Sequence, residues 1–247
     1  MSQEIIIGKN PVFAALQSGR TIHKVLMSEQ LHPNMQEKLN KLGKKAGAVV
    51  QKVPKNKLDR TAKGNHQGII AYVAPYTYVS LDDLFAQASK VDEAPFFIIL
   101  DELEDPHNLG SIIRTAHAAG AHGVIIPKRR SVGLTAAVAK TAAGALEHVP
   151  VARVTNISYT IDELKERNVW VVGTDAEGDE DYRMLDGALP IAIVIGNEGK
   201  GMSRLVKEKC DWTVNLPMKG KISSLNASVA CGILLYEVFR KRHPLGE

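Results

Sequence analysis

The sequence predicts an α/β protein, with a small basic α/β/α domain followed by a larger domain built on a mostly parallel sheet. From Pro95 onward, short apolar segments alternate with segments of helical periodicity, a pattern typical of parallel strands covered by helices on both faces. Residues before Ala74 show a shorter series of the same kind. The charge changes at the same place, since residues 1–75 carry 12 Lys/Arg and 4 Asp/Glu, whereas residues 76–247 carry 19 and 23.

Capping residues and periodicity predict each element of the first domain in turn. Asn10 followed by Pro11 predicts a helix start, because Asn caps helices and Pro suits the first helical position; this helix should end near Gly19. Strands should follow at residues 22–28, 48–53 and 68–73. A lysine-rich helix at 34–46 and a short helix at 57–62 should lie between them. The composition then changes around a short helical stretch, which predicts domains over 1–75 and 95–247 with a linker over 76–94.

The second domain is expected to begin with a strand at 96–100 and to end with a helix at 225–240. Between them the pattern predicts helices at 109–119, 135–141 and 161–167, and strands at 124–126, 149–154, 170–174 and 191–195. A compact basic unit beside this acidic domain suits a polyanionic partner, because Lys and Arg displace counterions from phosphates. A solvated lysine-rich surface would explain the charge equally well.

The chain lacks the marks of membrane proteins, disulfide-rich proteins and common nucleotide-binding enzymes. Its apolar segments fall far short of the roughly 20 residues that span a bilayer, and no signal-peptide core is present, so we expect a cytoplasmic protein without membrane contact. Cys210 and Cys231 have no partner at disulfide or metal-ligand spacing. Neither a P-loop nor a dinucleotide-binding glycine fingerprint is present.

Four acidic residues follow the 96–100 segment and raise the alternative of a magnesium site: Asp101, Glu102, Glu104 and Asp105. Acidic residues in such a loop also favour the positive end of the helix that follows. No phosphate-binding motif accompanies the cluster, so we expect no metal.

Three segments of the second domain carry a more specific signal, and the first runs from Asp105 to Arg114. Asn108 is expected to cap the helix, and Gly110 lies four residues before Arg114, so the two share one helix face. Taken alone, this segment is more typical of a capped surface helix with a solvated arginine than of a functional site.

The second segment joins the strand at 191–195 to Gly196-Asn-Glu-Gly-Lys-Gly. Three glycines in six residues allow backbone conformations that other residues avoid, and they let a ligand approach the backbone closely. Glu198 lies at the centre of this loop. A tight structural turn is the alternative interpretation.

The third segment runs from Leu216 to Ala230. It leads into a helix with an apolar stripe on one face and small residues on the other, so that the helix can pack on both sides. Packing does not explain Asn226, a polar residue expected in the first turn of an apolar helix.

In this order and setting, the three segments resemble the signature motifs of the SpoU/TrmH branch of the SPOUT methyltransferases. The resemblance extends over about residues 96–240, and residues 1–75 resemble the RNA substrate-binding domain that precedes the catalytic domain in several members. It is strongest to members that methylate a guanosine ribose in bacterial 23S rRNA. The resemblance implies a C-terminal trefoil-knot domain, S-adenosylmethionine as cofactor, RNA as substrate, and a homodimer that uses the final helix.

The resemblance also implies roles for individual residues. The cofactor-binding positions would be Gly196, Leu216 and Leu225, with Thr174 and Met218 as walls of the pocket. The catalytic group would comprise Arg114, Asn108, Glu198, Ser224 and Asn226.

Methyl transfer to a ribose hydroxyl requires alignment of the hydroxyl and stabilisation of negative charge on its oxygen. Arg114 suits the second task because a guanidinium almost never loses its proton, and the other four residues would orient it and the ribose by hydrogen bonds. Two alternatives stay open. The target could be tRNA, or the chain could be a non-catalytic RNA-binding ribosome-assembly factor that keeps the fold.

Overall fold

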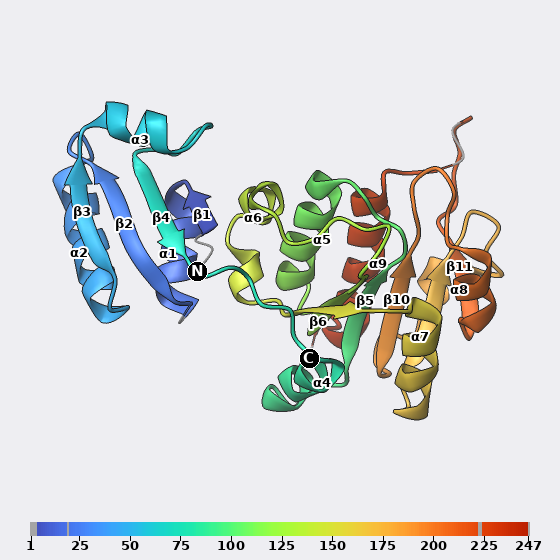
Figure 1. Ribbon diagram of the computed structural model, residues 1–247. Coiled ribbons are helices and arrows are strands. Elements are labelled where there is room, and N and C mark those ends of the chain that lie inside the picture. Colours follow the sequence, from blue (N-terminus) through green and yellow to red (C-terminus); the bar gives the residue numbers. More distant parts are fainter. Residues whose placement is uncertain (1–3, 19, 222–223, 247) are drawn as a thin grey trace. The chain divides into compact units, whose positions relative to one another are not determined.

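The protein divides into two compact units in the computed structural model, which describes residues 4–18, 20–221 and 224–246 (Figure 1). Unit 1 comprises Met1–Thr77 and Leu134–His148, and unit 2 comprises Tyr78–Gly133 and Val149–Glu247. Each unit has its own sheet and its own apolar core.

Unit 1 is built on a mixed sheet with strand order β1-β4-β2-β3, formed by β1 (Glu4–Ile7), β2 (Ile22–Ser28), β3 (Val49–Val53) and β4 (Ile69–Val73). β4 runs antiparallel to β1 and β2, and β3 runs parallel to β2. Successive residues of β2 point to opposite faces, so Val25 and Met27 pack with α1 (Lys9–Ser18) and α2 (Pro33–Lys45), whereas Leu26 packs with α3 (Lys55–Thr61). The unit is the expected α/β/α sandwich, and it also includes α6 (Ala136–Ala142) and η1 (Ala145–Glu147).

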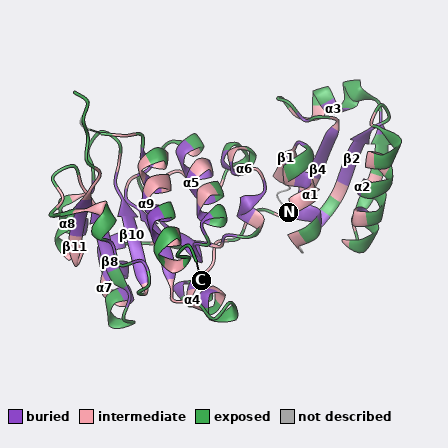
Figure 2. Cartoon of the chain, turned by 180° about the vertical axis from the view of Figure 1, so that it is seen from behind, coloured by how far each residue is buried: buried purple, intermediate pink, exposed green. Residues whose placement is uncertain are grey.

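Unit 2 is built on a seven-stranded parallel sheet with strand order β7-β6-β5-β10-β8-β11-β9. The strands are β5 (Phe96–Leu100), β6 (Gly123–Pro127), β7 (Val151–Val154), β8 (Trp170–Thr174), β9 (Glu180–Asp181), β10 (Ile191–Ile195) and β11 (Trp212–Asn215). Every residue of the central strands β5 and β10 is buried, because helices cover both faces of the sheet (Figure 2). The α/β fold class predicted from the sequence is therefore confirmed.

Two sets of helices cover the two faces of this sheet. α4 (Leu81–Lys90), α7 (Ile157–Glu166) and α8 (Arg204–Lys209) place apolar side chains in one core with alternate residues of β5, β8 and β10. α5 (Pro106–Ala118) and α9 (Ala227–Arg242) pack against each other, and they also contact β6 and β10 respectively. The short helix η2 (Tyr182–Met184) follows β9. Because all strands are parallel, the loops that follow them meet at one edge of the sheet.

The structure corrects two predicted helix starts. Asn108 was expected to cap α5, but this prediction is wrong, because the helix already begins at Pro106 and Asp105 Oδ1 accepts a hydrogen bond from His107 N at 2.9 Å. Asn108 is instead buried inside the first turn. Asn226 lies not within the first turn of α9 but at its N-cap, where its side chain accepts from Ser228 N and Val229 N.

Six elements were not predicted, namely β1, β9, α8, β11 and the short helices η1 and η2. They are short, and three of them lie at or beside the edge of a sheet, where little in the sequence distinguishes them from loops. Among the described residues, no helix is long and apolar enough to cross a membrane. The same residues contain no group of His, Cys, Asp and Glu side chains that could hold a metal ion.

Candidate functional site

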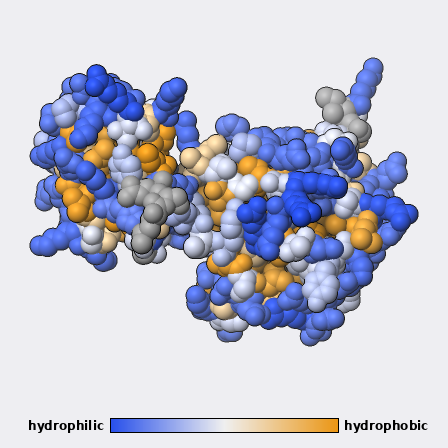
Figure 3. Space-filling view, viewed as in Figure 1, coloured by the Kyte–Doolittle hydropathy of each residue, from blue (hydrophilic) through white to orange (hydrophobic). Residues whose placement is uncertain are grey.

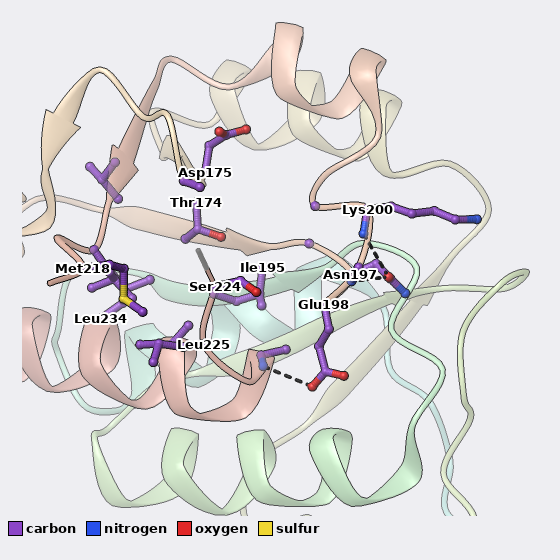
Figure 4. A pocket seen from close by; sticks show the side chains of 18 residues that line it. Thr174, Asp175, Ile195, Asn197, Glu198, Lys200, Met218, Ser224, Leu225 and Leu234 are labelled. Carbon is purple, nitrogen blue, oxygen red and sulfur yellow. Dashed lines mark hydrogen bonds between the residues drawn. The ribbon is translucent and has the colours of Figure 1, made fainter. Parts of the chain in front are cut away.

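A cavity of about 350 Å³ lies where the carboxyl ends of three neighbouring strands of unit 2 meet (Figure 4). Thr174 ends β8, Ile195 ends β10, and Val214 lies near the end of β11; all three line the cavity. The 196–201 loop closes one side, and the start of α9 closes another. The cavity therefore occupies the edge of the sheet where open α/β folds bind their ligands.

All five positions expected to bind the cofactor line this one cavity: Gly196, Leu216, Leu225, Thr174 and Met218. Figure 4 shows Met218, Leu225 and Leu234 together at one end, with Thr174 and Asp175 on the other side. The cavity thus has an apolar end and a polar wall. Residues 222–223 of the third predicted segment lie outside the described residues.

The 196–201 loop is a tight turn in which glycine is required at its first position. Asn197 and Gly201 exchange two backbone hydrogen bonds of 2.9 and 2.8 Å. A Cβ atom on Gly196 would lie only 2.3 Å from backbone atoms of Gly201 and Met202. Any side chain at this position would force the turn open, so the shape of the cavity wall depends on glycine there.

Three of the expected catalytic residues form one hydrogen-bond network. Glu198 Oε1 accepts from Asn108 Nδ2 and from Asn226 Nδ2, each at 2.6 Å, and from Ala227 N at 3.2 Å. Asn226 Nδ2 also donates to Asn108 Oδ1 at 3.0 Å. The network joins the first turn of α5, the 196–201 loop and the N-cap of α9, which are far apart in the sequence.

The other two expected catalytic residues lie outside this network. Arg114 is exposed on α5, and it has no hydrogen bond or ion pair with any of the described residues. It follows Asn108 by six residues, about 9 Å along the helix axis. Ser224 lines the cavity without a hydrogen bond among the described residues. Arg114 is therefore accessible to a ligand that approaches from solvent.

Two side chains of the site were not singled out from the sequence. Asp175 lines the cavity, forms an ion pair of 2.7 Å with Lys207 and accepts from Glu177 N at 2.9 Å. Burial acts to raise the pKa of Asp175, but these hydrogen bonds and the charge of Lys207 hold it below its usual value. The signal available in the sequence was an acidic residue directly after a buried strand.

Asn197 is the second such residue. Its Nδ2 donates to Glu102 O at 3.0 Å, and its Oδ1 accepts from Gly199 N at 3.0 Å and from Lys200 N at 3.3 Å. It therefore fixes the 196–201 loop against the loop that follows β5, a role that its position within a glycine-rich segment did not reveal.

The acidic cluster after β5 serves to hold loops together. Asp101 is buried and accepts from Ser203 N at 2.7 Å, and Asp105 caps α5. Glu102 pairs with Arg130 at 2.9 Å. Arg130 belongs to an exposed basic segment with Lys128 and Arg129, which follows β6 at the same edge of the sheet as the cavity.

Comparison with known proteins identifies both parts of the chain. Residues 95–236 match the SpoU rRNA Methylase family, and residues 5–79 match the RNA 2′-O ribose methyltransferase substrate-binding domain. A putative TrmH family tRNA/rRNA methyltransferase of Bacillus subtilis is 58% identical over 249 residues, covering 100% of both chains. The Staphylococcus aureus protein of the same description is 51% identical over the full length of both chains.

Solved structures agree with this grouping. The SpoU methyltransferase AviRb from Streptomyces viridochromogenes, in complex with AdoMet, is 27% identical with a TM-score of 0.81, covering 97% of this chain and 90% of that one. The AdoMet-bound rRNA methyltransferase from Sinorhizobium meliloti is 26% identical with a TM-score of 0.78, covering 99% and 88%. The tRNA-modifying TrmH/SpoU enzyme of A. aeolicus is 28% identical with a TM-score of 0.55, but covers 64% of this chain and 84% of its own. The chain therefore belongs to the SpoU/TrmH family of RNA 2′-O-ribose methyltransferases and carries the family's substrate-binding domain at its N-terminal end.

Proposed function

We propose that the protein transfers a methyl group from S-adenosylmethionine to the ribose 2′-hydroxyl of a guanosine in 23S rRNA, and that it does so as a homodimer. The observation that carries this proposal is the cavity beside Glu198, because its walls contain all five positions expected for the cofactor. We assign residues 1–75 to RNA substrate binding and residues 95–247 to catalysis, joined by residues 76–94.

The residues of the cavity fit the cofactor chemically. Leu216, Met218 and Leu225 would give the adenine ring an apolar surface, and Thr174 and Asp175 would offer oxygen acceptors to the ribose hydroxyls and the ammonium group. The absence of a side chain at Gly196 allows the bound molecule to approach the backbone. Relatives that share the fold over nearly the whole chain bind AdoMet.

When bound, the cofactor supplies an electrophilic methyl group on a sulfonium. As the methyl group leaves the sulfonium and bonds to the 2′-oxygen, Arg114 would donate hydrogen bonds to that oxygen and so stabilise the negative charge that develops there. The hydroxyl proton would pass to a neighbouring RNA phosphate or to water, because a guanidinium keeps its own protons and cannot take up another. The network of Asn108, Glu198 and Asn226 would hold α5, and with it Arg114, in a fixed position relative to the cavity wall. Ser224, which lines the cavity, would orient the ribose through its hydroxyl group.

Two observations favour rRNA over tRNA as the substrate. The rRNA methyltransferase of Sinorhizobium meliloti matches 99% of this chain, whereas the tRNA-modifying enzyme of A. aeolicus matches 64%. The chain also places exposed cations on both units, in the basic first 75 residues and at Lys128, Arg129 and Arg130 of unit 2. Phosphates of a large folded RNA could contact both.

The homodimer is supported by the outward face of α9. Val229 and Tyr236 are each 50% exposed, and they lie on the same side of the helix as the half-buried Ile233. The opposite face is already occupied, since Cys231, Leu234 and Leu235 are fully buried. A second copy of α9 would cover the exposed apolar stripe.

The test is methylation of RNA from a strain that lacks the gene. Purified protein and methyl-labelled S-adenosylmethionine are incubated with that strain's rRNA and, separately, with its tRNA. We expect label on the ribose of one guanosine in 23S rRNA and none in tRNA. Label in tRNA alone would show that the substrate is tRNA and not 23S rRNA. Cofactor binding without transfer to either RNA would favour a non-catalytic assembly factor.

A further inference from the structure

Unit 1 contains a cavity of its own, of about 380 Å³, that methyl transfer does not require. It lies between the end of β2, the helix α3 and the 63–68 loop that leads into β4. All of its walls belong to unit 1, the unit that contains the substrate-binding domain. The cavity therefore raises the question of what part of an RNA it would accept.

The 63–68 loop is held in a fixed shape around a buried histidine. His66 Nδ1 accepts from Gly68 N at 3.0 Å, so the neutral ring carries its proton on Nε2, which lies 2.9 Å from Asp59 Oδ1. Gly64, Gln67 and Gly68 all have positive φ, at 117°, 51° and 79°. Gln67 is held in this uncommon conformation because its Oε1 accepts from Lys9 N at 2.9 Å.

The walls of the cavity combine three kinds of chemistry. Leu31 gives one apolar surface, and a Cβ atom on Gly68 would lie 3.1 Å from it, so the glycine keeps this surface open. The Gln30 side-chain amide has no hydrogen-bond partner among the described residues, and Asp59 presents a carboxylate to solvent. Lys55 supplies a positive charge on the same rim.

The opposite charges of Asp59 and Lys55 disfavour a simple ion. A free anion would be repelled by Asp59, and a cation would be repelled by Lys55. A nucleotide satisfies both, because it carries a flat base with polar edges and a phosphate. Besides Lys55, which lines the cavity, four further exposed cations lie on α3 and its flanks, namely Lys52, Lys57, Arg60 and Lys63. They form part of the hydrophilic surface over α3 (Figure 3).

We propose that this cavity binds one unpaired guanosine of the RNA substrate, with Asp59 reading the base and the α3 cations holding the adjoining phosphates. Guanine is the base whose Watson–Crick edge presents two neighbouring N–H donors, N1–H and N2–H, which match the two oxygens of a carboxylate. Asp59 Oδ1 keeps its hydrogen bond from His66 Nε2 and accepts from the base through its second lone pair. Leu31 packs against the face of the base, and Gln30 reaches its remaining edge. The proposal rests on RNA being the substrate, but it adds a second contact point, separate from the methylated ribose.

The decisive variant is Asp59→Asn, because binding by charge alone and recognition of guanine predict opposite changes in RNA affinity. If unit 1 binds RNA through charge alone, removing a carboxylate tightens binding. If Asp59 reads guanine, the same change weakens binding by roughly tenfold, the discrimination of one bidentate pair. The matched control is Glu37→Gln, which removes an equal charge from α2, a helix that packs on the opposite face of the sheet.

The probe is a short fluorescein-labelled single-stranded RNA that contains one guanosine, compared with the same RNA carrying inosine, which lacks the N2 amino group. By fluorescence anisotropy, the full-length wild-type protein and the Glu37→Gln variant should prefer guanosine, and the Asp59→Asn variant should bind both RNAs alike. Equal or tighter binding of guanosine RNA by the Asp59→Asn variant would overturn the proposal.

Because Asp59 also holds His66, Asp59→Asn could weaken RNA binding by disturbing the 63–68 loop, and a second variant separates the two effects. Gln30→Ala leaves the His66 contact intact and should weaken binding of the guanosine RNA about fivefold or more. Unchanged binding by this variant would overturn the proposal even if Asp59→Asn unfolds. Failure of methyl transfer by a wild-type protein that still prefers guanosine would reject the proposed function and leave the guanosine site standing.

Discussion

The network around Glu198 gives the sharpest quantitative prediction. In Glu198→Gln the amide oxygen can still accept the bonds from Asn108, Asn226 and Ala227, but it no longer carries a charge. A hydrogen bond to a charged group is worth about 1 kcal/mol more than a neutral one, which gives about 3 kcal/mol for three bonds. Glu198 is exposed, so water screens part of this difference, and we expect a loss of about 1–2 kcal/mol.

Function should respond more than stability does, because Glu198 positions α5 against the cavity wall. We expect single-turnover methylation to fall about tenfold, while the affinity for S-adenosylmethionine changes by less than about threefold. Urea unfolding measures the stability, and isothermal titration measures the affinity. The matched control is Glu104→Gln, an exposed acid of the loop between β5 and α5 with no hydrogen bond or ion pair among the described residues. Equal stability and equal rate for the two variants would refute the reasoning.

Three other changes test separate parts of the proposal. Arg114→Ala should keep cofactor binding and lower the single-turnover methylation rate by about a hundredfold or more. Arg114→Lys should restore little of this rate, because a point charge does not reproduce the planar guanidinium. A rate for Arg114→Ala within a few-fold of wild type would remove Arg114 from the mechanism. Tyr236→Glu, on the exposed face of α9, should halve the sedimenting mass to that of the 26.9 kDa chain, whereas an unchanged mass would exclude this face from the interface. Burial raises the pKa of Cys231 to about 12, so iodoacetamide at mildly alkaline pH should modify this thiol only after denaturation. Mass spectrometry of the labelled protein measures the modification. Rapid labelling of Cys231 in the native protein would contradict this and show that α9 opens.

Periodicity and caps were enough to locate the long, strongly patterned elements. The strand at 191–195 and the helix at 33–45 were predicted to within a residue or two. An uninterrupted apolar run and a lysine-rich amphipathic pattern are each compatible with few other secondary structures. β1 and β11 were missed because each has four residues and becomes a strand only through pairing with β4 or β8. Such pairing is a tertiary property that local sequence does not encode.

The site was predictable in its parts but not in its connections. The glycine-rich loop and the polar residue at the start of an apolar helix both stood out as irregularities. The loop lines the cavity, and Asn226 lies between two residues that line it, Leu225 and Ala227. The partners of Glu198 did not stand out, since Asn108 lies 90 positions and Asn226 lies 28 positions away in the sequence. Asn108 looked like a helix cap because caps and buried polar anchors use the same residue types.

Asn226 shows why asparagine, rather than a charged residue, suits the joint between these segments. The first N–H groups of a helix have no acceptor within the helix, so a side chain that accepts from them and also donates to a neighbouring loop joins the two segments. Asn226 Oδ1 accepts from Ser228 N at 3.1 Å and from Val229 N at 3.4 Å, which caps α9, while its Nδ2 donates to Glu198 and Asn108. Aspartate could cap the helix but would repel the carboxylate, and lysine could pair with the carboxylate but has no acceptor for the helix N–H groups. An amide does both, so the start of α9 and the position of Glu198 are fixed by one residue.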